Sequence, residues 1–176
     1  MNNLPRGFAH PPQYGVIVGT VIAILAGGKV TVKLDSLDLS LDCLVMQPYA
    51  GKNFGTFLIP EEGSEVLVAF NESDPRKSVV LGCLWYGGDK PPIPGGKDNG
   101  PKLIKTKGGH RLLLDDSENA QKIEIVDSGG NNRIVLDTPG NSITIETKGK
   151  LVLKGGEVEI EATGPLNLKG LLINLN

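Results

Sequence analysis

The sequence predicts an all-β protein in which a small closed barrel is followed by an intertwined trimeric β-helix. Three observations lead to this fold class. Apolar and polar residues alternate with a period of two in many short runs, which is the pattern of strands. The 24 Gly and 12 Pro residues among 176 divide these runs into short elements. No stretch repeats apolar residues at the i, i+3, i+4 and i+7 spacing, so we expect very little helix.

Residues 14–87 make up the predicted barrel, and residues 1–13 are expected to be an N-terminal arm. Turn residues separate the extended segments, and no helical crossover fits between them. We interpret this unit as a compact five-stranded barrel of the OB type, because closure removes the open sheet edges of so short a domain. The expected extended segments are Tyr14–Leu25, Lys29–Leu34, Leu39–Met46, Thr56–Ile59, Glu65–Phe70 and Ser78–Tyr86.

The first of these segments also imitates the core of a signal peptide. Gly15–Ala26 is apolar, and Arg6 lies upstream. However, Pro11 and Pro12 precede the run, many of its residues are β-branched, and it is too short to span a membrane. We therefore interpret it as a buried strand and expect no signal peptide.

A linker is predicted at residues 88–103. The run from Gly87 to Pro101 is dense in Pro and Gly and nearly free of apolar residues. Such composition is typical of a boundary between domains. Residues 104–176 then form the second predicted domain.

Short apolar pairs recur through this second domain, with one residue inside each pair. The first residues of successive pairs are 11, 11, 9, 8, 7, 8 and 7 positions apart, so the spacing contracts toward eight. A repeat of this kind indicates the architecture of a whole domain. The pairs are Leu112/Leu114, Ile123/Ile125, Ile134/Leu136, Ile143/Ile145, Leu151/Leu153, Val158/Ile160, Leu166/Leu168 and Ile173/Leu175.

The short repeat favours a triple-stranded β-helix. A repeat of eight leaves about five residues for a strand and about three for a corner, and one chain of such strands would leave two sheet edges open. Three chains wound around one axis would bury the apolar pairs, each Ile or Leu contributing about 1.5–3 kcal/mol. An ordinary antiparallel sandwich with short hairpins is the alternative. The expected trimer core is Ile123, Ile125, Ile134, Leu136, Ile143, Ile145, Leu151, Leu153, Val158, Ile160, Leu166 and Leu168.

The sequence predicts no catalytic, cofactor or metal site. Cys43 and Cys83 lack a C-x-x-C spacing, and His10 and His110 are far from both in the chain. We expect both cysteines to be buried free thiols. The Asp residues fall at predicted strand ends and turns, without a His or Arg that would complete an acid–base site. A net charge of −2 with scattered Lys and Arg argues against binding of nucleic acid by phosphate neutralisation.

An ordered series of motifs resembles the phage baseplate protein V and VgrG spike family, over nearly the whole chain. The barrel motifs are Gln47–Lys52, Phe57–Phe70, Asp74–Arg76, Val80–Gly87 and Lys90–Pro92. Thr106–Arg111 followed by Leu112–Asp116 resembles the family's entry into its β-helix. One departure is Leu44, where the family often has Trp; this changes the packing of the barrel but not its fold.

The resemblance implies a non-enzymatic homotrimeric spike at the centre of a contractile tail or injection-system baseplate. The barrel would attach to a baseplate hub protein, and the β-helix would pierce the target cell envelope on contraction. The expected location is a virion or an extracellular contractile particle, made in the bacterial cytoplasm. The C-terminus lacks the H-x-H motif of spikes that bind iron at their own tip. A separate PAAR-like tip protein is therefore expected, docked on Leu171, Leu172, Ile173 and Leu175.

A second function remains open from the residues alone. An OB barrel can bind oligosaccharide or single-stranded nucleic acid, with the repeat serving as a trimerising stalk. Such a site needs aromatic residues over a basic groove. In this sequence the aromatic residues are not interleaved with Lys or Arg, so no nucleic-acid partner is expected.

Overall fold

A computed structural model describes residues 15–70, 77–97 and 99–174 of the chain. The chain divides into two compact units, Met1–Pro94 and Gly95–Asn176, and the division falls within residues 88–103. The helical element with described bounds is a short 3-10 turn at Asp35–Leu37. No helix among the described residues is both long enough and apolar enough to cross a membrane.

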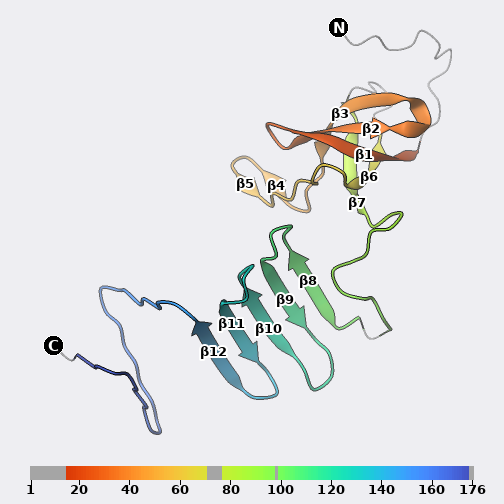
Figure 1. Cartoon of the computed structure of the whole chain (residues 1–176). Coiled ribbons are helices and arrows are strands. Elements are labelled where there is room, and N and C mark those ends of the chain that lie inside the picture. The colour runs from red at the N-terminus through yellow and green to blue at the C-terminus, as the bar shows by residue number, and fades with distance from the viewer. Residues whose placement is uncertain (1–14, 71–76, 98, 175–176) are drawn as a thin grey trace. The chain divides into compact units, whose positions relative to one another are not determined.

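The first unit is a closed barrel with strand order β1-β2-β3-β7-β6 (Figure 1). All its pairs are antiparallel except β3 with β7. The prediction of an all-β chain with a five-stranded barrel of the OB type is confirmed. The barrel strands are β1 (Val16–Leu25), β2 (Lys29–Leu34), β3 (Leu39–Val45), β6 (Glu65–Ala69) and β7 (Val79–Leu84), and a small hairpin of β4 (Ala50–Gly51) and β5 (Phe54–Gly55) stands outside them.

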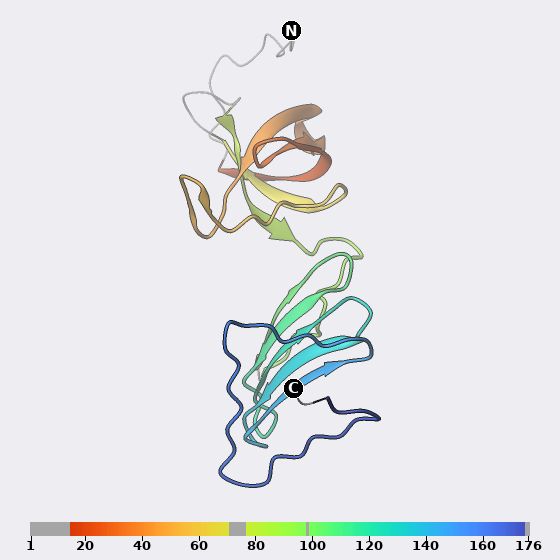
Figure 2. The same ribbon diagram turned by 90° about the vertical axis from the view of Figure 1, so that its left-hand side faces the viewer.

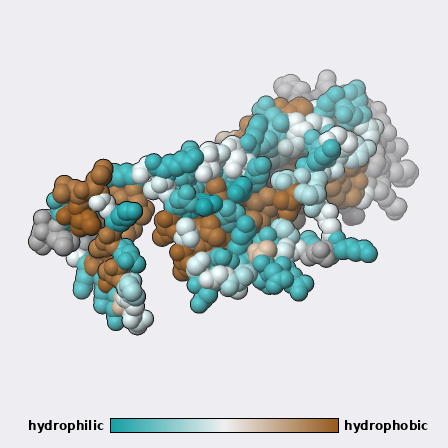
Figure 3. Space-filling model, turned by 60° about the horizontal axis from the view of Figure 1, so that its bottom comes forward, coloured by the Kyte–Doolittle hydropathy of each residue, from teal (hydrophilic) through white to brown (hydrophobic). Residues whose placement is uncertain are grey.

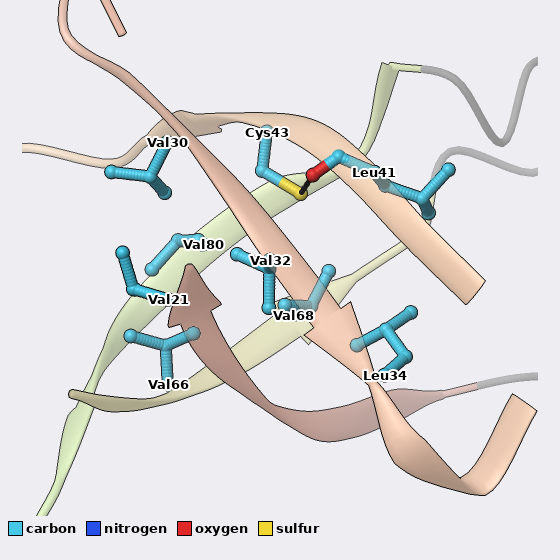
Figure 4. Packing of buried hydrophobic residues seen from close by; sticks show 9 residues of the cluster. All are labelled: Val21, Val30, Val32, Leu34, Leu41, Cys43, Val66, Val68 and Val80. Atoms are coloured by element: carbon cyan, nitrogen blue, oxygen red, sulfur yellow. Dashed lines mark hydrogen bonds between the residues drawn. The ribbon is translucent and has the colours of Figure 1, made fainter. Parts of the chain in front are cut away.

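The period-two pattern of these strands fills the barrel with small branched side chains (Figure 4). Gly19 lets β1 pass close to β2. A Cβ atom at this position would lie 2.6 Å from side-chain atoms of both Leu34 and Val32. The buried cluster comprises Val21, Val30, Val32, Leu34, Leu41, Cys43, Val66, Val68 and Val80.

The extended segment expected at Thr56–Ile59 is not a strand of the barrel. The structure has no ladder there, and the pairing lies earlier, in the β4–β5 hairpin. The reason is Gln47, whose side-chain amide takes both backbone hydrogen-bonding groups of Leu58. Because the backbone N–H and C=O of Leu58 already bond to a side chain, they cannot pair with a neighbouring strand.

The expectation that both cysteines are buried is correct for Cys43 and wrong for Cys83, although both thiols are free. The pairing of β7 explains the difference. β3 reaches only Val79 and Val80, so the second half of β7 has a neighbouring strand on one side only. Its side chains from Leu81 onward are therefore exposed.

The second unit contains a five-stranded antiparallel sheet in which each strand pairs with the next along the chain (Figure 1). Tight turns join the strands, and Gly109, Asn119, Gly130 and Asn141 have positive φ there. Gly and Asn are the residues that adopt this conformation most readily. The strands are β8 (Pro101–Lys105), β9 (Arg111–Asp115), β10 (Lys122–Val126), β11 (Asn132–Asp137) and β12 (Ser142–Thr147).

The predicted β-helix is not seen over β8–β12, where the strands of one chain form consecutive hairpins in a single sheet. The 11-residue spacing explains this, because it accommodates a strand of five or six residues and a reversing turn. Where the spacing contracts to eight, pairing within the chain ends. The described residues after Thr147 form no ladder and continue as a coil beyond β12 (Figure 1 and Figure 2). A β-helix built by several chains stays a prediction for this segment.

Candidate assembly surface

One face of the β8–β12 sheet consists of apolar side chains. Residues directly opposite each other in an antiparallel ladder share a face, as do residues two apart on one strand. Ile125, for example, lies opposite Leu112 and Ile134. The register places two rows on the same side, which we call the apolar face: Ile104, Leu112, Ile125, Ile134 and Ile145 in one row, and Leu114, Ile123, Leu136 and Ile143 in the other.

The apolar face is open to solvent in the single chain. The exposed fraction of its side chains reaches 72% at Ile143 and is still 38% at Ile134, in the middle of the sheet. Figure 3 shows hydrophobic residues gathered in broad patches on the surface. Soluble monomers rarely expose contiguous apolar patches of this kind, which usually mark an interface.

The opposite face of the same sheet carries Leu103, Leu113, Val126 and Val135 together with charged side chains that pair with one another. Glu124 is only 7% exposed and forms ion pairs with Arg111 at 3.3 Å and with Lys122 at 3.8 Å. Arg133 and Glu146 pair at 2.7 Å across β11 and β12. Among the described side chains that are not exposed, no buried nitrogen or oxygen lacks a hydrogen-bond partner. The buried polar groups of this face therefore need no hydrogen-bond partner from another protein.

Polar side chains also fix the turns at the ends of the sheet. The Asp127 carboxylate accepts hydrogen bonds from the backbone N–H groups of Asn131 and Asn132 at 2.8 and 3.0 Å. The hydrogen bond from the backbone N–H of Asn132 is the main cause of the lowered pKa of Asp127. Hydrogen bonds from Ser117 lower the pKa of Asp115 in the same way. These acidic groups thus have a structural role in the turns.

The structure brings half of the predicted trimer core together. These six residues all lie on the apolar face: Ile123, Ile125, Ile134, Leu136, Ile143 and Ile145. The other six lie exposed on the segment after β12: Leu151, Leu153, Val158, Ile160, Leu166 and Leu168. Of the predicted tip-docking residues, Leu171, Leu172 and Ile173 are exposed, and Leu175 lies outside the described residues. The contacts predicted for both sets stay predictions.

Three residues of the apolar face were not among the predicted core residues. Leu112 and Leu114 form the first apolar pair, and their sequence pattern could have placed them in the core. Ile104 gave a weaker signal, because the residue two positions before it is Lys102. The register shows that Ile104 lies opposite Leu112 and so completes its row.

A shallow groove of about 600 Å³ runs over one end of the apolar face. It is lined by Ile125, Ile134 and Ile145 of the face and by Leu151 of the C-terminal segment. Leu151, a predicted core residue of the C-terminal segment, therefore lies beside the sheet. The described residues contain no cluster of three or more His, Cys, Asp or Glu side chains that could hold a metal ion.

Comparison with known proteins gives a consistent result. Residues 13–85 match the model of a family described as the type VI secretion system/phage-baseplate injector OB domain. The type VI secretion system spike proteins VgrG1a and VgrG1c of Pseudomonas aeruginosa are each 32% identical over 89 residues, which is 46% of this chain. The actin cross-linking toxin VgrG1 of Vibrio cholerae is 23% identical over 143 residues, or 75% of this chain. These matches span 14%, 12% and 13% of the three relatives.

Proposed function

Since this chain is related through its barrel to the VgrG-like spike family of type VI secretion systems and phage baseplates, we propose that it is a structural, non-enzymatic central spike. Three copies form the spike, with the barrels attached to a baseplate hub protein. The second units and C-terminal segments project from the baseplate and pierce the target cell envelope when the machine contracts. The particle is a phage tail or another injection machine, assembled in the bacterial cytoplasm.

The observation that carries this proposal is the contrast between the two faces of the β8–β12 sheet. One face satisfies its own charges, while the other leaves eight large apolar side chains exposed. Around a threefold axis, the three apolar faces cover one another, and the opposite faces with their paired charges point to solvent. Burying an Ile or Leu side chain fully is worth about 1.5–3 kcal/mol. Covering the partly exposed side chains of three copies therefore offsets the cost of association.

The C-terminal segment fits the same arrangement. Its apolar pairs recur at the eight-residue spacing and find no ladder partners within the chain. In the trimer, the segments of the three copies supply each other's partners as a triple-stranded β-helix. The apolar end at Leu171, Leu172 and Ile173 is then covered by a separate PAAR-like tip protein, with Leu175 as a further expected contact.

The polymer-binding alternative gains no support from the outer surface of β2 and β3. The Lys33 ammonium is paired with Asp35 at 2.8 Å, and the Thr31 hydroxyl donates to Asp42 at 2.7 Å. Polar groups that are already paired with each other in this way have few hydrogen bonds left to make with a sugar or phosphate. We therefore propose no second function for the barrel.

Light scattering on the purified full chain tests the oligomeric state. The expected mass is three times the 18.6 kDa of one chain, independent of protein concentration in the micromolar range. A stable monomer would contradict the proposed spike.

The tip partner is tested by co-purification with a PAAR-like protein from the same gene cluster. Deleting residues 171–176 should abolish its binding, while Lys154→Asp, which changes the charge earlier in the segment, should preserve it. Undiminished binding after the deletion would refute the docking site. A metal ion at the apex of the isolated trimer would refute the need for a separate tip.

A further inference from the structure

The first unit carries an exposed aromatic arm, which we define as residues 46–58. The rings of Tyr49 and Phe54 contact each other, with centroids 5.3 Å apart. Both are more than half exposed, and Phe57 is 77% exposed. Figure 1 shows the β4–β5 hairpin of this arm standing out from the barrel.

The arm is held in one conformation although its side chains face solvent. Gln47 bonds to both backbone groups of Leu58, and Thr56 N–H donates to Tyr49 O at 2.8 Å. Gly55 has a φ of 139°, and a Cβ atom there would lie 2.5 Å from Tyr49 O. A preorganised apolar arm loses little conformational entropy when it binds a partner.

The same unit carries a second exposed apolar surface, on the outside of β1, β6 and β7. Val18 lies opposite Leu67, which lies opposite Gly82. Val16 lies opposite Ala69, which lies opposite Val79. These six residues form what we call the barrel face, and Val16 and Val18 are 48% and 38% exposed on it. The outside of β2 and β3 is different, since Lys29, Thr31, Lys33, Ser40 and Asp42 are there.

The two surfaces also carry opposite charges. Lys52 lies in the turn between β4 and β5, is exposed, and forms no ion pair with a described residue. Glu65 lies on β6 next to the barrel face, opposite Thr20, whose hydroxyl donates to it at 3.0 Å. No other charged residue lies in the arm, so this pair fixes one orientation of the arm on the face.

We propose that the aromatic arm of one copy docks on the barrel face of the next copy, with Lys52 beside Glu65. The inference rests on the proposed trimer. Because the two surfaces differ, the contact is heterologous, and such contacts close into a ring when the rotation matches the number of copies. The β8–β12 sheets hold the three barrels at high effective concentration, so a modest contact area suffices. Three such contacts then join the three barrels into a closed ring.

Cross-linking of the full chain tests this contact. Lys52→Cys and Glu65→Cys are introduced together in a Cys83→Ser background, with Cys43 left buried, and the protein is treated with a short bismaleimide. Denaturing gels should show covalent trimers. Each single cysteine variant serves as a control and should give no trimer.

Light scattering on the same samples separates the possible outcomes. An intact trimer that yields no covalent trimer overturns the arm contact and leaves the proposed spike in place. A monomeric chain overturns both. A fast-migrating, internally cross-linked monomer shows the arm contacting its own barrel and also overturns the proposal.

A second measurement uses substitutions in place of cross-links. Val18→Asp and Phe57→Ser should each raise the rate of subunit exchange between labelled trimers by about tenfold, the equivalent of about 1.4 kcal/mol. Ile22→Ser is the matched control: Ile22 is 46% exposed but lies outside both surfaces, at the irregularity of β1, and its substitution should not change the rate. Equal rates for all three variants and the unmodified chain would overturn the proposal.

Discussion

The side-chain amide of Gln47 pairs with the backbone of Leu58 on both sides, donating to Leu58 O at 3.2 Å and accepting from Leu58 N at 3.0 Å. The Thr56 hydroxyl donates to the same amide oxygen at 3.2 Å. One side chain thus takes the place of a neighbouring strand and joins the two ends of the arm. These bonds are exposed, so their individual contributions are small, and their joint effect is on the conformation of the arm.

Gln47→Leu should loosen the arm without unfolding the barrel. Removing three hydrogen bonds in an exposed segment is expected to destabilise it locally by about 1–2 kcal/mol. Hydrogen exchange at residues 49–58 should therefore be about tenfold faster, and exchange in β2 and β3 should not change. Gln121→Leu in the second unit is the control. Unchanged exchange in the arm would contradict the role of Gln47.

Gly19→Ala should destabilise the barrel by about 1–3 kcal/mol. The added methyl group would lie 2.6 Å from side-chain atoms of Leu34 and Val32, so the packed core must shift to accommodate it. Thermal or denaturant unfolding measures the loss. Gly88→Ala is the matched change, since a Cβ atom there meets nothing within 4 Å, and it should leave stability nearly unchanged. Equal effects of the two substitutions would show that β1 does not pass β2 as described.

The two thiols should react at very different rates. Burial, with a smaller effect from Asp42, raises the pKa of Cys43 to about 11, and its side chain lies inside the barrel. Cys83 is exposed, although partial burial of its thiol raises its pKa too. A maleimide at about pH 8 should label one cysteine per folded chain and two per unfolded chain. In Cys83→Ser protein the fast reaction should be absent; its persistence would place Cys43 at the surface.

The second unit should lose stability in acid through its turns. The pKa of Asp127 is lowered from 3.8 by backbone hydrogen bonds, chiefly from Asn132. The Asp127 carboxylate therefore contributes fully to the free energy of unfolding at pH values above its pKa in the unfolded chain. This contribution is lost as the pH falls below about 4 and through the lowered pKa of the folded state. Asp127→Asn should reduce the loss of stability in that range. Asp116→Asn removes an exposed carboxylate outside this turn and should leave the loss of stability in acid unchanged. If stability depended on pH equally in the two variants, the role assigned to Asp127 would be wrong.

The sequence-based predictions succeeded where local pattern determines structure. Alternation along the barrel strands gave their positions within a residue or two, since an inward Val or Leu every second residue suits no other element. The extended segment at Thr56–Ile59 joins no sheet, because a side chain, Gln47, takes the place of a neighbouring strand at Leu58. Nothing in the alternation of apolar residues reveals such a contact.

The site was harder to predict than the fold. The apolar pairs identified six residues that the structure places on one face, and they missed Ile104 because Lys102 interrupts its pair. The same pattern is compatible with hairpins and with a β-helix. Spacing separates the two, since an 11-residue repeat accommodates a strand and a turn within one chain. The described residues of the eight-residue repeat have no ladder partner within the chain, so the pattern of one chain does not specify their pairing.

The most direct test of the trimeric spike compares Ile145→Asp with Thr144→Asp by light scattering and thermal unfolding of the full chain. The two neighbouring residues of β12 point to opposite faces of the sheet, with Ile145 on the apolar face. In a trimer, Ile145→Asp places three carboxylates in the apolar interface, at a cost of several kcal/mol each. We expect Thr144→Asp and the unmodified chain to be trimers of similar stability, and Ile145→Asp to be monomeric or aggregated. An Ile145→Asp trimer with an unchanged melting temperature would contradict the account.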